Sequence, residues 1–303
     1  MQQVKAKVLK NEEISEGYFR LSIEAPEISQ NAAPGQFVML KVGNSYDPLL
    51  RRPFSIHKIN KNGIEVLYKV IGKGTGMMGH IKPEEGVDLI GPLGNGFSSG
   101  PDIKEALIVG GGIGAAPLLA LAEELKNKVK KITVFLGGRG RHDILCVEEF
   151  EEVGAEVKIA TDDGSLGHKG FVTEILEQHL RQPQGTAPTP DFSLIYSCGP
   201  HMMSKKVAGI SSQFNIPCQV SLEAHMACGV GACLGCVIKT KKGTILTPPN
   251  PHFDKEGVPK EGELPSCGCD SNFVSCDAQG SETSYKRVCM EGPVFVAEEV
   301  VWD

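Results

Sequence analysis

One glycine-rich loop limits what this chain can fold into more than any other stretch. Residues 221–236 read SLEAHMACGVGACLGC and space Cys228, Cys233 and Cys236 as C-x4-C-x2-C. Plant-type [2Fe–2S] clusters use this spacing together with a fourth, more distant cysteine. The intervening glycines lack Cβ, so backbone N–H groups can approach the cluster sulfurs closely. A structural zinc is the alternative, although zinc sites usually pair two short cysteine knuckles.

The remaining composition limits the class of protein. The 303 residues suffice for two to three domains, and the net charge of −6 does not suggest a nucleic-acid-binding surface. The N-terminal sequence MQQVKAKVLKNEEI lacks the apolar core of a secretory signal, and no apolar run reaches membrane-spanning length. We therefore expect a cytoplasmic protein without a membrane segment. In that compartment its ten cysteines would serve as metal ligands or buried thiols rather than disulfides.

Residues 1–100 have the pattern of a small antiparallel β-barrel. Short β-branched or aromatic segments are separated there by Pro, Gly and Asn. The expected strands are Val4–Leu9, Phe19–Ile23, Phe37–Val42, Phe54–Ile59 and Ile64–Val70.

Two motifs in this region could bind a phosphate. The sequence RRPFSI places Arg52 at the entry to a strand, and Gly72–Gly76 precedes a stretch that could begin a helix. A glycine loop that opens a helix offers free N–H groups, and an arginine adds a bidentate partner. A third loop, Gly91–Phe97, is expected to close the region, with a linker at Pro101-Asp102.

Residues 101–222 predict a parallel α/β sheet. The strand Ala106–Val109 runs into the turn GGGIG at Gly110–Gly114, and a helix is expected over Leu118–Lys128. Strand, glycine turn and helix suit a pyrophosphate at the helix N-terminus, although the standard G-x-G-x-x-G spacing is absent. The further strands are expected at Ile132–Leu136, Val157–Ala160 and Phe192–Tyr196, and the helices at Cys146–Val153, Val172–His179 and Met202–Phe214.

Glycine-containing loops follow three of these strands. They lie at 137–139, 162–165 and 197–200. Because ligands bind at the carboxyl ends of parallel strands, we expect the loops to share one binding site.

Residues 223–303 form the expected cysteine domain. A polar segment rich in Pro and Gly, at about 241–284, is predicted to be an insertion. It contains Cys267, Cys269 and Cys276. Order should return at Tyr285–Phe295, which we expect to be a strand.

Five motifs occur in a characteristic order: Arg52-Pro-Phe-Ser, Gly74-Thr75, the GGGIG turn, Ser197-Cys-Gly-Pro and the cysteine loop. Together they resemble the electron-transfer subunits of class 1B dihydroorotate dehydrogenases, within the ferredoxin–NADP⁺ reductase superfamily. The resemblance covers nearly the whole chain except about residues 241–280. It implies an FAD-binding barrel at 1–100, an NAD(H)-binding α/β domain at 101–222 and a small 2Fe–2S domain at 223–303.

The resemblance also implies roles for individual residues. Ser55 would bond the flavin ring near N5, Arg52 would pair with the FAD diphosphate, and Cys198 would lie beside the nicotinamide. The implied cofactor-binding residues are Arg52, Pro53, Phe54, Ser55, Leu67, Tyr68, Lys69, Gly74, Thr75, Gly110, Gly111, Gly112, Gly114, Cys198, Gly199 and Pro200.

The fourth cluster ligand is the point of departure from the family. The family's last ligand precedes an acidic-G-P-V-F sequence, which Cys289 satisfies alongside Cys228, Cys233 and Cys236. In the family a short loop links the third and fourth ligands, whereas 52 residues intervene here. The three cysteines of the insertion therefore remain competitors, or members of a second metal site or redox pair.

The implied function is electron transfer between NAD(H) and a partner through FAD and the cluster. The partner would be an FMN-containing dihydroorotate dehydrogenase catalytic subunit, expected in a heterotetramer. This subunit needs no general acid or base, so His57, His80, His142 and His201 are expected to be surface or structural residues.

Two other functions remain open. The chain could be a subunit of an NADH-dependent ferredoxin:NADP⁺ oxidoreductase or sulfide dehydrogenase, or a zinc-stabilised binding module without redox activity. Arg139 and Arg141 follow the second strand of the sheet and could bind a 2′-phosphate. We expect NADH on resemblance alone.

Overall fold

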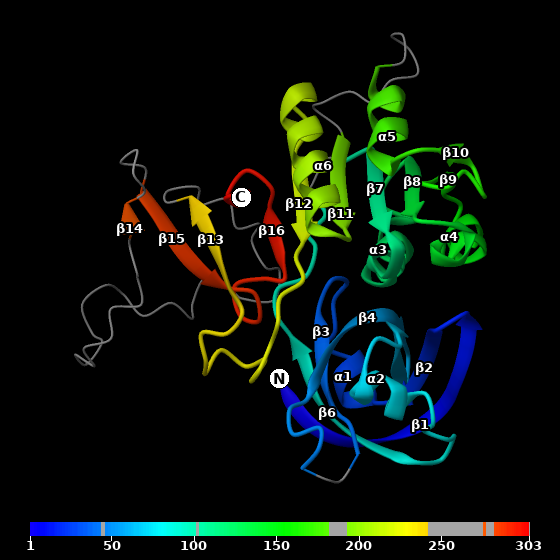
Figure 1. The fold of residues 1–303 in the computed structure, drawn as a ribbon, viewed down its shortest axis with the longest axis vertical. Helices are drawn as coiled ribbons and strands as arrows, with labels where there is room; N and C mark the ends of the chain where they lie inside the picture. The colour runs from blue at the N-terminus through cyan, green and yellow to red at the C-terminus, as the bar shows by residue number, and fades with distance from the viewer. Residues whose placement is uncertain (44–45, 101–102, 182–192, 242–274, 277–281, 303) are drawn as a thin grey trace.

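A computed structural model describes residues 1–43, 46–100, 103–181, 193–241, 275–276 and 282–302. The predicted linker at 101–102 and most of the insertion, with Cys267 and Cys269, lie outside the described residues. The described chain forms a closed barrel, a seven-stranded sheet with helices and a three-stranded sheet (Figure 1).

The barrel forms because alternate residues of its strands are apolar and point inward. Leu21 and Ile23 of one strand and Val38 and Leu40 of another lie fully buried in its core. The strand order is β1-β2-β5-β4-β3-β6. Its elements are β1 (Gln2–Ser15), β2 (Tyr18–Glu24), α1 (Pro26–Ser29), β3 (Phe37–Lys41), β4 (Arg52–Asn60), β5 (Gly63–Lys69), α2 (Lys73–Met78) and β6 (Gly86–Leu93).

The sixth strand is absent from the sequence prediction, which placed a loop at Gly91–Phe97. Gly91 lies in β6 and pairs with Gln2, so the loop begins later than predicted. Glycine is required here because a Cβ on residue 91 would lie 2.6 Å from Cγ1 of Val38. Gly91, which suggested a turn in the sequence, is therefore a glycine at which two strands approach closely.

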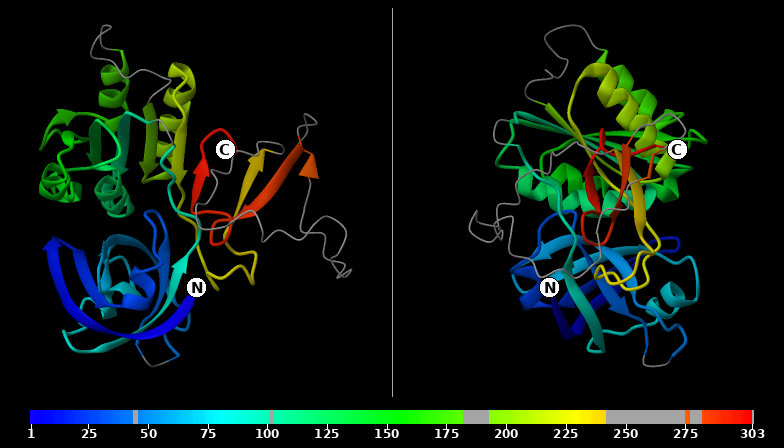
Figure 2. Two further views of the ribbon diagram at one scale, coloured as in Figure 1. Left: turned by 180° about the vertical axis from the view of Figure 1, so that it is seen from behind. Right: turned by 90° about the vertical axis from the view of Figure 1, so that its left-hand side faces the viewer.

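The middle part is a parallel α/β sheet, as predicted, and the structure shows that it is doubly wound. Neighbouring residues of its strands face opposite helix layers: Leu107 and Val109 contact the core under α5 and α6, and Ala106 and Ile108 the core under α3 and α4. Helices accordingly lie on both sides of the sheet (Figure 2). The elements are β7 (Glu105–Gly111), η1 (Gly112–Gly114), α3 (Ala115–Leu125), β8 (Lys131–Gly138), η2 (Arg141–Asp143), α4 (Val147–Glu152), β9 (Glu156–Thr161), β10 (His168–Lys169), α5 (Val172–Leu180), β11 (Ser193–Cys198), α6 (His201–Phe214) and β12 (Cys218–Ser221).

The C-terminal part is joined to this sheet by hydrogen bonds. β13 (Val237–Lys241), β14 (Ser275–Cys276) and β15 (Glu282–Arg287) form the small sheet, but β16 (Val294–Val296) pairs antiparallel with β12. The prediction of one strand over Tyr285–Phe295 is therefore wrong. A turn that carries Cys289 separates β15 from β16.

The barrel also contacts both other parts. Nδ1 of His57 on β4 lies 2.8 Å from the carbonyl oxygen of Ala116 on α3. The backbone N–H of Asn95, just after β6, donates to the carbonyl of Gly292, just before β16. No helix in the described part of the chain is long and apolar enough to cross a membrane.

Candidate functional site

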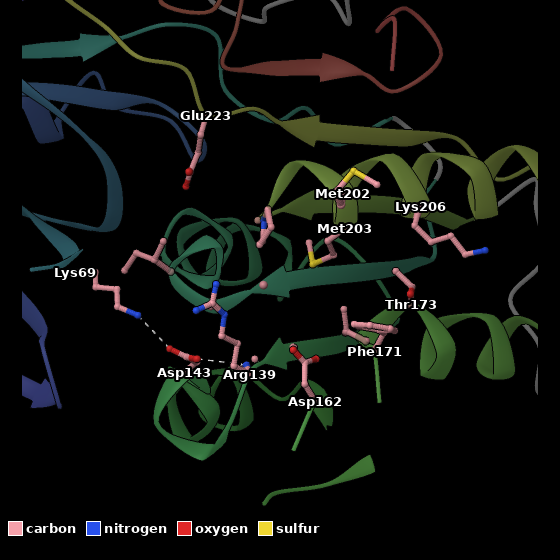
Figure 3. A pocket seen from close by; sticks show the side chains of 18 of the residues that line it. Lys69, Arg139, Asp143, Asp162, Phe171, Thr173, Met202, Met203, Lys206 and Glu223 are labelled. Atoms are coloured by element: carbon pink, nitrogen blue, oxygen red, sulfur yellow. Dashed lines mark hydrogen bonds and ion pairs between the residues drawn. The ribbon is translucent and has the colours of Figure 1, made fainter. Parts of the chain in front are cut away.

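A cavity of about 1020 Å³ opens at the carboxyl ends of β7, β8, β9 and β11. β7 and β11 are neighbours, and the helices that follow them pack on opposite faces of the sheet. Such a switch point leaves a crevice, which is where open α/β sheets bind their ligands. The three predicted loops meet here, through Gly138 and Arg139, Asp162, and Gly199 and Pro200 (Figure 3).

The four glycines of the GGGIG turn have different surroundings. A Cβ on Gly114 would lie 2.2 Å from the carbonyl oxygen of Cys198, and one on Gly111 would lie 2.6 Å from Sδ of Met203. Gly112 has φ +53°, and a Cβ there would meet no atom within 4 Å. Gly111 and Gly112 line the cavity, so this turn exposes backbone at the start of α3.

Cys198 does not line the cavity, although the next residue, Gly199, does. The Cys198 side chain is buried at the end of β11, and burial raises the pKa of its thiol to about 12. A Cβ on Gly199 would lie only 3.0 Å from Cα of Gly111. The thiol is therefore neutral at physiological pH.

The barrel closes the cavity with a polar contact that joins the two parts. Lys69 Nζ donates to the Tyr18 hydroxyl at 2.7 Å, and that hydroxyl donates to Oδ1 of Asp143 at 2.5 Å. Lys69 also lies 3.3 Å from Asp143 (Figure 3). Partial burial alone would raise the pKa of Asp143, but its bonds to Tyr18 and Lys69 lower it. The bond to Tyr18 raises the pKa of Lys69.

Glu223 adds a carboxyl group from above the cavity. It follows β12, and its side chain points toward the cavity (Figure 3). Surrounding protein atoms remove part of its hydration and raise its pKa, which favours the neutral acid.

The opposite end of the cavity has mixed charge. Arg139 and Asp162 both line it. Arg141 does not, because its backbone N–H donates to Oγ of Ser165 at 2.9 Å and its Nη2 donates to the Ser165 carbonyl at 3.2 Å. Of the two predicted 2′-phosphate candidates, only Arg139 reaches the site.

The two predicted phosphate motifs of the barrel meet. A Cβ on Gly74 would lie 3.2 Å from Nε of Arg52, while Cβ atoms on Gly72 and Gly76 would meet nothing within 4 Å. The Thr75 hydroxyl accepts hydrogen bonds from the Ile71 and Gly72 backbone N–H groups at 2.9 and 3.2 Å, which fixes the turn.

The remaining predicted flavin residues follow the alternation of their strands. Pro53, Phe54 and Ser55 continue β4 from Arg52 and remain partly exposed. On β5, Tyr68 points into the barrel, where its hydroxyl donates to Asn11 Oδ1 at 3.1 Å. Leu67 and Lys69 point the other way, toward the α/β part. A flavin contact by Tyr68 would therefore involve its backbone.

The four predicted cluster ligands converge. Cys236 and Cys289 are buried, and burial and the neighbouring Cys236 thiol raise the pKa of Cys289 to about 12. The Sγ of Cys228 accepts the Cys233 backbone N–H at 3.3 Å. Burial alone would raise the pKa of Cys228, but backbone hydrogen bonds lower it to about 7.

Arg287 holds the two sides of this cysteine pocket together. It donates to the carbonyl of Gly231 in the loop at 3.0 Å and to the Glu291 carboxylate at 2.7 Å. Cys289 lies between Arg287 and Glu291 in sequence, so its turn is fixed against the loop. The side chain of Cys276 lies outside the described part of the chain, as Cys267 and Cys269 do.

Sequence reasoning missed the polar residues between the parts. Tyr18 and Asp143 belong to no predicted motif, whereas Asp162 opens the predicted 162–165 loop and Glu223 lies in the 221–236 stretch without a predicted role. Asp162 follows β9, and Glu223 precedes the cysteine loop. Their positions after strands were the available signal; Tyr18 and Asp143 gave none.

The fold and the cavity define a reductase of the ferredoxin–NADP⁺ reductase type. The solved structure of an NADH-dependent reduced ferredoxin-NADP oxidoreductase matches with a TM-score of 0.75 and 27% identity, over 99% of this chain and 91% of that one. A ferredoxin NADP⁺ reductase from Neisseria gonorrhoeae with bound FAD and NADP has a TM-score of 0.58 and 17% identity, over 71% of this chain and 92% of that one. The latter likeness concerns the fold alone.

Family comparisons narrow the class. Residues 108–209 match the oxidoreductase NAD-binding domain, and residues 223–247 and 274–301 match the iron-sulfur cluster binding domain of dihydroorotate dehydrogenase B. The electron transfer subunit of dihydroorotate dehydrogenase B (NAD⁺) from Desulforamulus reducens is 38% identical over 300 residues, 98% of each chain. That from Clostridium perfringens is 41% identical over 247 residues, 82% of this chain and 94% of its own. The chain belongs to this family of electron transfer subunits, which confirms the resemblance inferred from the motifs.

Proposed function

We propose that this chain carries electrons between NAD(H) and an FMN-containing dihydroorotate dehydrogenase subunit. The observation that carries the proposal is the convergence of Cys228, Cys233, Cys236 and Cys289 beside a reductase-type cavity in one chain. When bound, FAD supplies hydride exchange with nicotinamide and single-electron exchange with an iron–sulfur cluster. The residues of the chain bind and orient these groups.

The cavity at the switch point fits NAD(H). Its volume of about 1020 Å³ suits a dinucleotide, and Gly112 leaves its backbone open on the cavity side. The N–H groups at the start of α3 would bind the pyrophosphate, assisted by Gly111. Glu223, whose pKa is raised by burial, would hydrogen-bond to the nicotinamide amide.

The barrel motifs fit FAD. Arg52 lies against Gly74, so a guanidinium and open backbone face the same space. They would bind the diphosphate by charge-assisted hydrogen bonds. Ser55, farther along β4, and the Leu67–Lys69 segment of β5 would orient the flavin ring toward the NAD(H) cavity, which Lys69 already lines.

The cysteine pocket fits a [2Fe–2S] cluster. Four thiols meet there, and backbone N–H groups already point at the sulfur of Cys228. Such donors stabilise thiolates and tune the potential of iron–sulfur centres. Cys289, rather than a cysteine of the insertion, would complete the ligand set with Cys228, Cys233 and Cys236.

Several exposed apolar side chains near this pocket suit a protein partner. Leu234, between two ligands, is 64% exposed, and Met290, next to Cys289, is 46% exposed. Val237 and Tyr285 on the adjoining strands are exposed as well. Exposed apolar side chains clustered at a redox centre favour a docking site. The catalytic subunit would bind here, in a cytoplasmic heterotetramer.

A second candidate is a subunit of an NADH-dependent ferredoxin:NADP⁺ oxidoreductase. The solved structure of one such enzyme covers 99% of this chain with a TM-score of 0.75. Its identity of 27% is lower than the 38% and 41% of the dihydroorotate dehydrogenase relatives, which favours the first candidate.

Co-purification tests the proposal. The tagged chain should retain a yellow-brown chromophore and an FMN-containing partner, and the complex should reduce NAD⁺ with dihydroorotate. Cys228→Ser should keep the flavin absorption but lose that reaction, because electrons no longer reach the partner. Cys218→Ser, which alters a buried cysteine remote from the loop, serves as the control.

Three outcomes would contradict the proposal. A complex that reduces NADP⁺ with reduced ferredoxin and NADH would favour the second candidate. A colourless protein that binds zinc would favour a non-redox module. Full NAD⁺ reduction by the Cys228→Ser complex would remove the cluster from the electron path.

A further inference from the structure

A second cluster of metal-ligating side chains lies between the barrel and the α/β part. One ring nitrogen of His57, Sγ of Cys146 and a carboxylate oxygen of Glu149 all lie within 4.8 Å of one another. His57 comes from β4, whereas Cys146 and Glu149 come from the start of α4. None of these residues belongs to the cavity or the cysteine pocket.

His57 is arranged as a metal-ligating histidine would be. Its side chain is fully buried, and Nδ1 lies 2.8 Å from the carbonyl oxygen of Ala116, to which it can only donate. Nε2 is therefore the nitrogen with a free lone pair, and it has no hydrogen-bond partner. Burial lowers the pKa of His57 to about 4, so this lone pair is unprotonated at neutral pH. Histidine ligands of metals usually donate their other ring N–H to a carbonyl or carboxylate in this way.

Cys146 and Glu149 supply a thiol sulfur and a carboxylate oxygen. Cys146 has φ +63°, a left-handed conformation uncommon for a side chain with Cβ, and its thiol is buried. Glu149 bonds to Arg20 through Oε1, and a carboxylate can serve an arginine and a cation at once. The guanidinium also lies 4.0 Å from Glu65, which offsets its positive charge.

We propose that His57, Cys146 and Glu149 bind a divalent cation of the zinc class, which links the barrel to the α/β part. Histidine nitrogen, cysteine sulfur and carboxylate oxygen are the ligands of protein zinc sites, and three protein ligands leave one position for water. Binding replaces the thiol proton of Cys146 with the metal and releases that proton to solvent. No electron is transferred, and the proposal does not rest on the proposed function.

Zinc analysis of the full-length chain, loaded with FAD and iron, provides the test. After exposure to equimolar Zn²⁺ and gel filtration, the wild type should retain stoichiometric zinc. Its zinc X-ray absorption should show a single sulfur with nitrogen and oxygen neighbours. Cys146→Ser should lose that sulfur signal. Its zinc affinity should fall by more than about 100-fold, because loss of an outer-shell partner alone costs about 10–100-fold. FAD and iron should be unchanged.

Two variants make the outcome specific. Cys218→Ser removes another buried thiol of the α/β part and should retain the zinc. His57→Gln replaces the ring by an amide and should lose zinc even if Cys146→Ser does not fold. Zinc should raise the melting temperature of the wild type and of Cys218→Ser, but not of Cys146→Ser or His57→Gln. Three results would overturn the proposal. They are a wild type that retains no zinc, a Cys146→Ser variant that retains as much zinc as the wild type, and a zinc shell of four sulfurs, which would place the metal in the cysteine pocket.

Discussion

The close approach of Gly114 to Cys198 makes a quantitative prediction for Gly114→Ala. Gly114 has φ −62°, so alanine causes no backbone strain there. The new Cβ would lie 2.2 Å from the Cys198 carbonyl oxygen and 2.7 Å from Cα of Gly199. Restoring ordinary contact at 3.4 Å moves the Cys198–Gly199 backbone by about 1 Å away from α3. Overpacking of this kind costs about 3 kcal/mol, or about 6–12 °C in melting temperature.

Gly112→Ala is the matched comparison two residues away. Its Cβ would meet no protein atom within 4 Å, but φ is +53°. The left-handed backbone costs about 1–2 kcal/mol. We therefore expect a smaller loss of stability. Because the methyl group points into open space on the cavity side, the KM for NADH should rise while the rate at saturation stays near wild type.

Stopped-flow reduction of bound FAD by NADH separates the two variants. A displacement of about 1 Å at the nicotinamide end should slow flavin reduction about 100-fold in Gly114→Ala. Thermal unfolding measures the stability of both. The reasoning fails if Gly114→Ala melts and reacts like the wild type, or if Gly112→Ala is the slower and less stable variant.

Three further predictions address the barrel, the cysteine pocket and the contact between parts. Arg52→Ala should weaken FAD binding at least about tenfold because a charge-assisted hydrogen bond is lost, and flavin content after gel filtration measures this. Arg51→Ala is the control and should keep its FAD, because the Arg51 guanidinium bonds to Asp88 at 2.9 Å. Cys289→Ser should lose the reduced-state EPR signal, while the triple Cys267/Cys269/Cys276→Ser variant should keep it. Asp143→Asn should lower the free energy of unfolding at neutral pH by about 1–2 kcal/mol, measured by thermal unfolding, and Asp162→Asn should not.

The pH dependence of that last effect has a definite sign. The folded pKa of Asp143 is lowered, so its contribution is present above the unfolded value of about 3.9 and disappears as pH falls through the folded value. The folded pKa of Lys69 is raised, so its contribution is present below about 10.4 and disappears as pH rises through the folded value. Lys69 is 44% exposed, so solvent screening reduces its share. A constant difference between wild type and Asp143→Asn down to strong acid would contradict this account.

Local sequence patterns predicted the barrel and the α/β sheet because each strand repeats its own period. They failed where a strand is defined by a distant partner. β6 contains Gly91 and Pro92, which resemble a turn, yet pairing with β1 holds it in the sheet. β12 and β16 are short, and 72 residues lie between Ser221 and Val294, which pair. No local pattern specifies such a pairing.

In the candidate site, too, residues of local motifs were predictable and residues paired over a long sequence distance were not. Glycines and cysteines were predictable because chemistry requires them at fixed spacing, as in the cysteine loop. The Tyr18–Asp143 bond joins residues 125 positions apart, and His57 meets Cys146 only after the barrel docks on α3 and α4. Docking selects such residues for complementarity, and complementarity between distant segments leaves no periodic signal.

The segment after β12 links the two ends of the proposed electron path. Ser221 ends the strand that pairs with β11 and β16, and Glu223 reaches the NAD(H) cavity two residues later. Cys228 follows five residues beyond, and a Cβ on its neighbour Gly229 would lie 2.5 Å from Met39 of the barrel. Because β12 lies in the sheet and the loop packs on the barrel, the cysteine pocket is attached to both parts. This arrangement would hold a cluster bound in the cysteine pocket at a set distance from the cavity, without any side chain acting as a conductor.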